Sequence, residues 1–104
     1  GIRIALDYSH FVCAGFTPDQ VDPLIPYAGH VHLRQGADGD IQARWEDGIV
    51  DYPAVIRKLR EAGYEDYVVF EYEHDEWMQM DRCDVMTETI KMRDAVLPLF
   101  QRQR

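Results

Sequence analysis

The chain has 104 residues, of which 46% are hydrophobic and 29% charged, and this composition indicates one small globular domain rather than a disordered or fibrous chain. It contains no apolar run near the roughly 20 residues that span a bilayer and no signal segment, so we expect a cytoplasmic protein without membrane contact. Its formal net charge of -8 opposes binding to nucleic acid or an anionic membrane.

The first predicted strand-loop-helix unit spans residues 2–27. Its strand, residues 2–6, is apolar and is closed by Asp7. Further along, Thr17 can cap a helix that has Pro18 at its first position, where the missing N–H of proline is not needed. The pattern therefore predicts a loop after Asp7 and a helix from Thr17 onward.

The second predicted unit begins at His30 or Val31, and His32 lies near the end of its strand. A long polar loop with three glycines leads to Asp51, which is a plausible helix cap. Apolar side chains then recur at helical spacing until Gly63, which suits the left-handed residue that ends a helix.

The third predicted unit has a strand over residues 67–72, a loop rich in acidic and aromatic groups, and a helix over about residues 84–100. Glu71 lies at the end of this strand. We expect the inner stripe of the last helix to consist of Met86, Ile90, Val96, Leu97 and Phe100.

Strands that alternate with helices predict an α/β fold with parallel strands joined by right-handed crossovers. The nearly continuous apolar character of the strands indicates cover on both faces, yet three strands leave two sheet edges open. We therefore expect a homo-oligomer formed through these edges, or a piece of a larger fold. Gly1 in place of a start methionine suggests the scar of a removed tag, and Cys13 and Cys83 are too far apart for a cysteine motif.

Asp7, His32 and Glu71 fall at the same place in three successive strands. The carboxyl ends of parallel strands meet at one face, where ligands bind in such folds. Carboxylate and imidazole donors suit Mn, Co, Mg or Zn. The pattern predicts a divalent metal site, whereas each acid taken alone could equally be a solvated group or a helix cap.

Four motifs carry a family resemblance, and they occur in the expected order and spacing. They are LDYSH at residues 6–10, GHVHLR at 29–34, GIVD at 48–51 and GYEDYVVFE at 63–71. In these motifs the chain resembles the carboxyl-terminal part of xylose isomerase-like TIM barrels, most closely the sugar phosphate isomerase and epimerase branch. The resemblance implies three consecutive βα units, equivalent to strands six to eight, so that residues 1–104 form one C-terminal fragment of a barrel of about 250 residues.

The resemblance also implies roles for particular residues. Asp7, His32 and Glu71 would be metal ligands, and His10 would face the substrate or a second metal. The implied reaction is isomerisation or epimerisation of a small sugar or hydroxy-carbonyl compound by proton transfer through an enediolate, with Glu71 and His10 as catalytic groups. A fourth ligand, a glutamate on an earlier strand, has no counterpart in this sequence, so the isolated chain is expected to be catalytically incomplete.

Several positions stay open on sequence alone. Arg44 could bind a phosphate or carboxylate of the substrate, or pair with nearby acids. Gln35 stands where the family usually has an acidic residue. Residues 73–77 could form a lid or a solvated loop, and Tyr72 could stack on a sugar or pack beneath that loop.

Two alternative functions remain. The chain could be an inactive, self-associating structural remnant of a truncated gene. A DNA repair nuclease resembling endonuclease IV is a weaker alternative, because the loop after the second strand is acidic and the chain lacks the basic groove that such an enzyme needs.

Overall fold

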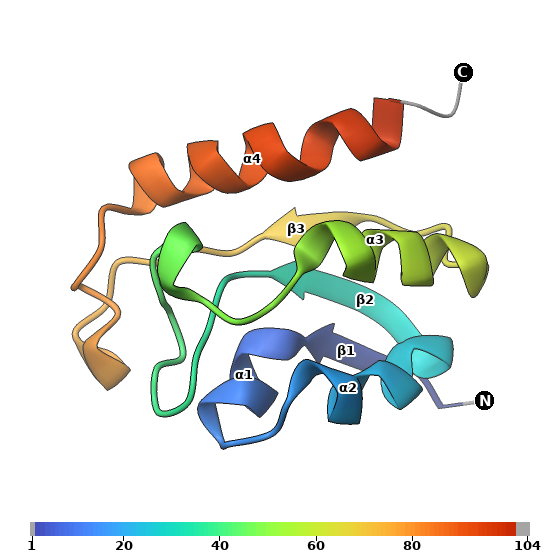
Figure 1. Ribbon diagram of the computed structural model, residues 1–104, viewed down its shortest axis with the longest axis horizontal. Helices are drawn as coiled ribbons and strands as arrows, with labels where there is room; N and C mark the ends of the chain where they lie inside the picture. Colours follow the sequence, from blue (N-terminus) through green and yellow to red (C-terminus); the bar gives the residue numbers. More distant parts are fainter. Residues whose placement is uncertain (1, 102–104) are drawn as a thin grey trace.

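The computed structural model describes residues 2–101 and contains one three-stranded parallel sheet. The strands are β1 (Ile4–Asp7), β2 (Ala28–Leu33) and β3 (Val68–Phe70), in the spatial order β1-β2-β3 (Figure 1). The predicted α/β class and parallel pairing are therefore confirmed. Because consecutive strands are neighbours, each connection carries its helices back across the sheet before the next strand begins.

The register aligns the three strand ends. Asp7 lies beside His32, and His32 lies beside Val69. The N–H of Glu71, immediately after β3, donates to the carbonyl of Leu33 at 2.9 Å. The predicted site residues consequently meet at one end of the sheet.

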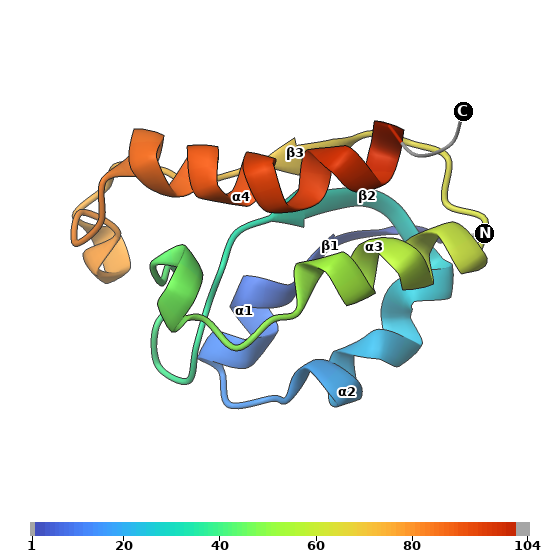
Figure 2. The ribbon, with the colours of Figure 1, turned by 45° about the horizontal axis from the view of Figure 1, so that its top comes forward.

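The helices lie on one side of the curved sheet (Figures 1 and 2). The α-helices are α1 (Tyr8–Cys13), α2 (Pro18–Val21), α3 (Tyr52–Glu61) and α4 (Val85–Gln101), and 3-10 turns cover Asp22–Tyr27, Trp45–Asp47 and Trp77–Gln79. The cap and stop predicted for α3 are confirmed: Asp51 Oδ1 accepts from the N–H of Ala54 at 3.1 Å, and Gly63 has a φ of +83°.

The connection between β1 and β2 differs from the sequence prediction. Helix α1 starts directly after β1, because the Asp7 carboxylate caps it by accepting from the Ser9 N–H at 2.9 Å. The helix predicted from Thr17 is one α-helical turn that continues as the 3-10 turn 22–27. Pro23 and Pro26 lack the N–H groups that longer α-helical bonding would need.

The hydrophobic core lies between the sheet and the helices. Leu6, Val31 and Leu33 are fully buried there. Alternate positions point the other way, and Ala5, His30 and Val69 are exposed. The expectation that the strands are covered on both faces is therefore wrong within residues 2–101, where only the helical side of the sheet is covered.

Helix α4 uses a different face from the one predicted. Met92 and Val96 are completely buried, but the other expected inner positions are exposed: Met86 is 68% exposed, Ile90 39%, Leu97 40% and Phe100 39%. The helix carries two apolar stripes, and the one containing Met92 and Val96 packs on the core.

The long loop between β2 and α3 is held by a buried amide. Gln35 Nε2 donates to the Val50 carbonyl at 2.6 Å, and the Val50 N–H donates to Gln35 Oε1 at 3.2 Å. Gly48 leaves room for this contact, since a Cβ there would lie 2.0 Å from Gln35 Oε1. The glutamine that departs from the family pattern thus joins the two ends of the loop.

Both cysteines are free thiols, with Cys83 buried and Cys13 partly so. Among the described residues, no helix combines the length and apolar character needed to cross a membrane.

The two faces of α4 give a direct prediction. Met92→Ala removes a fully buried side chain and should lower the free energy of unfolding by about 2–4 kcal/mol, whereas exposed Met86→Ala should change it by less than about 0.5 kcal/mol. Urea unfolding at low protein concentration measures both. Equal losses would show that α4 packs through the other stripe.

Candidate metal centre

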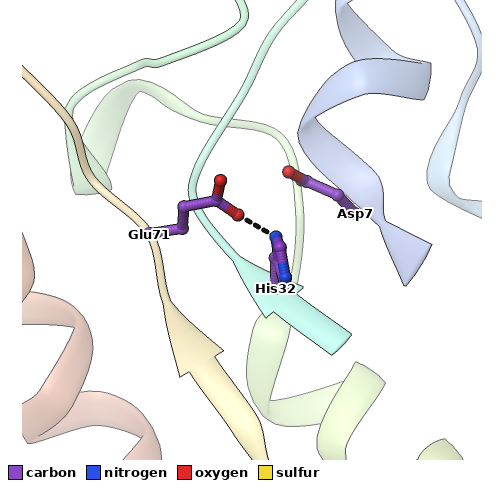
Figure 3. A group of neighbouring side chains, drawn as sticks. All are labelled: Asp7, His32 and Glu71. Carbon is purple, nitrogen blue, oxygen red and sulfur yellow. Dashed lines mark ion pairs between the residues drawn. The ribbon is translucent and has the colours of Figure 1, made fainter. Parts of the chain in front are cut away.

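The structure brings Asp7, His32 and Glu71 together (Figure 3). They come from the end of β1, from β2 and from the residue after β3, and one ligand atom of each lies within 4.8 Å of the others. Distances of this order allow one cation to contact all three donors after small side-chain rotations. The sequence predicted that these residues lie at the carboxyl ends of the strands, and the structure shows that their side chains converge there.

One donor atom of this cluster, Glu71 Oε2, lacks a hydrogen bond. Glu71 Oε2 is buried and, within residues 2–101, it is the buried side-chain nitrogen or oxygen atom that has no hydrogen-bond partner. It instead faces His32 Nδ1 as an ion-pair contact. A buried carboxylate oxygen without a donor is normally costly, and a cation bound jointly by Glu71 and His32 would satisfy it. The residues present therefore fit a divalent metal.

The Glu71 carboxyl lies in an environment that favours its protonated form. Burial raises the pKa of Glu71 above its usual range, the neighbouring Glu73 carboxyl raises it further, and His32 opposes the shift. Without a cation, this group therefore takes up a proton more readily than an exposed glutamate does.

Asp7 is held by its own helix. Its Oδ1 accepts from the N–H of Ser9 at 2.9 Å and from the Ser9 hydroxyl at 2.6 Å. These bonds fix the carboxylate at the strand end, where its other oxygen remains for charged partners.

Arg34 is the central residue that sequence reasoning missed. It is only 3% exposed, and its Nη2 lies 3.3 Å from Asp7 Oδ2, while its Nε donates to the Ser9 hydroxyl at 3.2 Å. Its Nη1 approaches the Met80 sulfur at 3.4 Å. The sequence could have indicated that Arg34 belongs to the site, because it follows His32 by two positions. Residues i and i+2 of an extended segment point to the same side.

A buried tyrosine fixes the backbone at this arginine. The Tyr52 hydroxyl donates to the Arg34 carbonyl at 2.6 Å. Burial raises the pKa of Tyr52 well above its usual range, so the phenol stays protonated and keeps donating.

The two other histidines of interest surround the cluster. His10 Nε2 lies 3.5 Å from Asp7 Oδ2 and 3.4 Å from Arg34 Nη2, and the His10 side chain is 56% exposed. His10 is therefore at the rim of the site, open to solvent. His30 lies on the uncovered sheet face, with its ring centroid 4.8 Å from that of His32 in an edge-on arrangement.

The structure does not bring Arg44 to the cluster. Arg44 is exposed and forms no hydrogen bond or ion pair through its side chain with any described residue. It lines a separate cavity of about 190 Å³, together with Asp40, Gln42, Asp47, Arg82 and Cys83, and none of Asp7, His32 and Glu71 lines that cavity. Its predicted contact with substrate thus has no support in the site geometry.

Hydrogen bonds from Tyr72 and Gln42 hold the start of the segment after β3 in place. The Tyr72 hydroxyl donates to the Ala43 carbonyl at 2.8 Å. Of the two roles considered for Tyr72, the structure therefore shows packing beneath the loop rather than stacking on a ligand. Gln42 Nε2 donates to the Glu73 carbonyl at 2.7 Å, and Gln42 Oε1 accepts from the Glu73 N–H at 2.8 Å. Residues 73–77 are exposed beyond this anchor.

Comparison with known families bears on this arrangement. The family model described as "Xylose isomerase-like TIM barrel" matches residues 1–95. The chain belongs to this family. The resemblance drawn from the four motifs is confirmed, and the parallel three-stranded sheet of this xylose isomerase-like chain agrees with part of such a barrel. Neither the curated proteins nor the solved structures gave a match.

The buried Arg34 gives a prediction about stability. Arg34→Met leaves the Asp7 carboxylate buried without its cationic partner and should lower the free energy of unfolding by about 3–5 kcal/mol. Arg44→Met is the matched control, because it removes an exposed arginine with no side-chain partner and should cost less than about 0.5 kcal/mol. Chemical denaturation compares the two, and similar losses would contradict a structural role for the Arg34 pair.

Proposed function

We propose that Asp7, His32 and Glu71 bind one divalent cation and form part of the active site of a sugar or hydroxy-carbonyl isomerase or epimerase. The observation that carries this proposal is the convergence of the three donors within 4.8 Å, with the buried Glu71 Oε2 lacking a hydrogen bond. Membership of the xylose isomerase-like family supports the same reaction class. Mn, Co, Mg and Zn all match this donor set.

A bound cation at this position would polarise a substrate carbonyl and favour the enediolate form. Glu71 is the residue suited to move the proton on the neighbouring carbon, because it is the carboxylate held at the strand end with an oxygen free of hydrogen bonds. His10, exposed at the rim and 3.5 Å from Asp7, is placed to contact a substrate hydroxyl. Arg44 could contact only a distant group of an extended substrate.

The proposed site is incomplete within residues 2–101. Proton exchange on the two sides of one carbon needs two positioned groups, and Glu71 is the one carboxylate of that kind in the described cluster. One face of the sheet is also uncovered, so the pocket is not dry. We infer that the isolated chain supplies metal ligands and one acid/base group but does not turn over substrate.

The alternative of an inactive structural remnant has an observation in its favour, namely the uncovered sheet face and the unpaired outer edges of β1 and β3 within residues 2–101. Metal binding by an intact fold distinguishes the two. A repair nuclease has less support, since exposed acids such as Asp38, Glu46 and Asp47 follow β2 and would repel phosphates.

Metal titration tests the proposal. Wild-type chain should bind one Co²⁺ or Mn²⁺ by calorimetry, and the same metal should raise its melting temperature. His32→Ala should weaken binding by about tenfold or more, because it removes a donor from the cluster. His74→Ala removes an exposed loop histidine and should leave binding unchanged. An intact fold that binds no metal would support the remnant.

Turnover provides a second test. With Mn²⁺ or Co²⁺ present, the isolated chain should not interconvert ketoses and aldoses, because the uncovered sheet face leaves the cluster in water, where the metal and Glu71 act weakly on a carbonyl substrate. Proton NMR of substrate in D₂O measures both interconversion and carbon-bound hydrogen exchange. Interconversion that is lost in Glu71→Gln would confirm the role of Glu71 and contradict the inferred incompleteness.

A further inference from the structure

The loops that follow β2 and β3 leave the same end of the sheet (Figure 1). Residues of both loops line the cavity of about 190 Å³ that contains Arg44. Typical ligand pockets measure roughly 300–1,000 Å³, so this one suits a single charged group or a small ion rather than a large ligand. The cavity is built by two neighbouring units of this chain.

A buried amide holds the two walls of this cavity together. Gln42, on the loop after β2, is 3% exposed, and its Nε2 donates to the carbonyls of Glu73 at 2.7 Å and Met80 at 2.9 Å. The same nitrogen lies 3.6 Å from the Sγ of Cys83. Because this one side chain ties the loop after β2 to the segment after β3, the cavity is preorganised before any ligand arrives.

Each wall contributes one arginine. Arg44 lies on the loop after β2 and Arg82 on the segment after β3, and both are exposed. Within residues 2–101, the guanidinium groups of Arg44 and Arg82 form neither a hydrogen bond nor an ion pair. Glu46, two positions from Arg44, pairs instead with Lys91 at 3.1 Å. Although the chain has a formal net charge of -8, two guanidinium groups at one cavity are therefore left without an acidic partner.

Two carboxylates share the cavity and limit the ligands that it can take. Asp40 Oδ1 accepts from the N–H of Gln42 at 3.2 Å, which holds this acid against its own loop, and Asp47 is exposed. These acids repel a ligand that carries negative charge alone. Hydroxyl groups on the same ligand would donate to the carboxylates. The lining therefore fits an anion that also carries hydroxyl groups.

We propose that this cavity binds a phosphate group, with Arg44 and Arg82 contacting it from the two loops. One guanidinium fork is enough to pair with the two oxygens of a carboxylate, whereas two forks on different loops match the additional oxygens and the second charge of a phosphate. The group belongs to free inorganic phosphate or to a small phosphate ester with hydroxyl groups. This site is separate from the metal cluster and does not depend on the proposed isomerase function.

Titration with inorganic phosphate tests the site. In a metal chelator and at constant ionic strength, ¹H–¹⁵N NMR should show saturable shifts of the Arg44 and Arg82 Nε–H signals. Arg44→Met and Arg82→Met should each weaken binding by about tenfold, because each removes charge-assisted hydrogen bonds. Arg57→Met is the matched control: it removes an exposed arginine of α3 that does not line the cavity, and it should leave binding unchanged.

A comparison of ligands identifies the source of the phosphate group. Glycerol 3-phosphate should bind more tightly than inorganic phosphate if its hydroxyl groups reach the carboxylates, and Asp47→Ala should then abolish the difference. Equal affinities of the two ligands would assign the site to free phosphate. Glycerol alone should cause no shift, since it lacks the anionic group.

Other outcomes would overturn the proposal. Absence of shifts at both arginines would show that the cavity does not take a phosphate group. Binding that survives both Arg44→Met and Arg82→Met, or that weakens equally in Arg57→Met, would show general attraction to surface charge. The NMR spectra also show whether each variant is folded. His32→Ala should leave phosphate binding unchanged, so failure of the metal proposal and failure of this one are distinguishable.

Discussion

The arrangement of this chain depends on the register of three parallel strands. Pairing of Asp7 with His32 and of His32 with Val69 sets the positions of the strand ends. A shift of one residue would turn the fully buried Val31 toward solvent and move His32 into the core. Hydrophobic burial on the helical side therefore fixes the polar cluster on the other side, although none of the cluster's own side chains determines the register.

Burial of charge gives the site its second constraint. Arg34 is almost inaccessible and contacts Asp7, so one acid of the cluster already has a fixed cationic partner. Glu71 lacks such a partner and faces His32 without a hydrogen bond. Asp7 therefore has a cationic partner within the chain and Glu71 does not. This difference indicates that a bound cation would be stabilised mainly beside Glu71 and His32.

Two surfaces of the described residues are uncovered. One sheet face is exposed, and α4 exposes Met86, Ile90, Leu97 and Phe100 beside the stripe that packs on the core. In a closed barrel the first surface would face other strands. The metal proposal therefore concerns the strand ends, where the three donors converge.

The sequence by itself determined the strand-helix alternation, the cap of α3 at Asp51 and the alignment of Asp7, His32 and Glu71, because these follow from local periodicity and strand ends. Only the tertiary structure decided which apolar stripe of α4 is buried, that Arg34 pairs with Asp7, and that Arg44 lies apart. Helix α4 has two apolar stripes, and both follow the helical period. The sequence pattern therefore does not show which stripe is buried, and only packing against the sheet determines it. A buried ion pair likewise joins residues 27 positions apart, which no local pattern records.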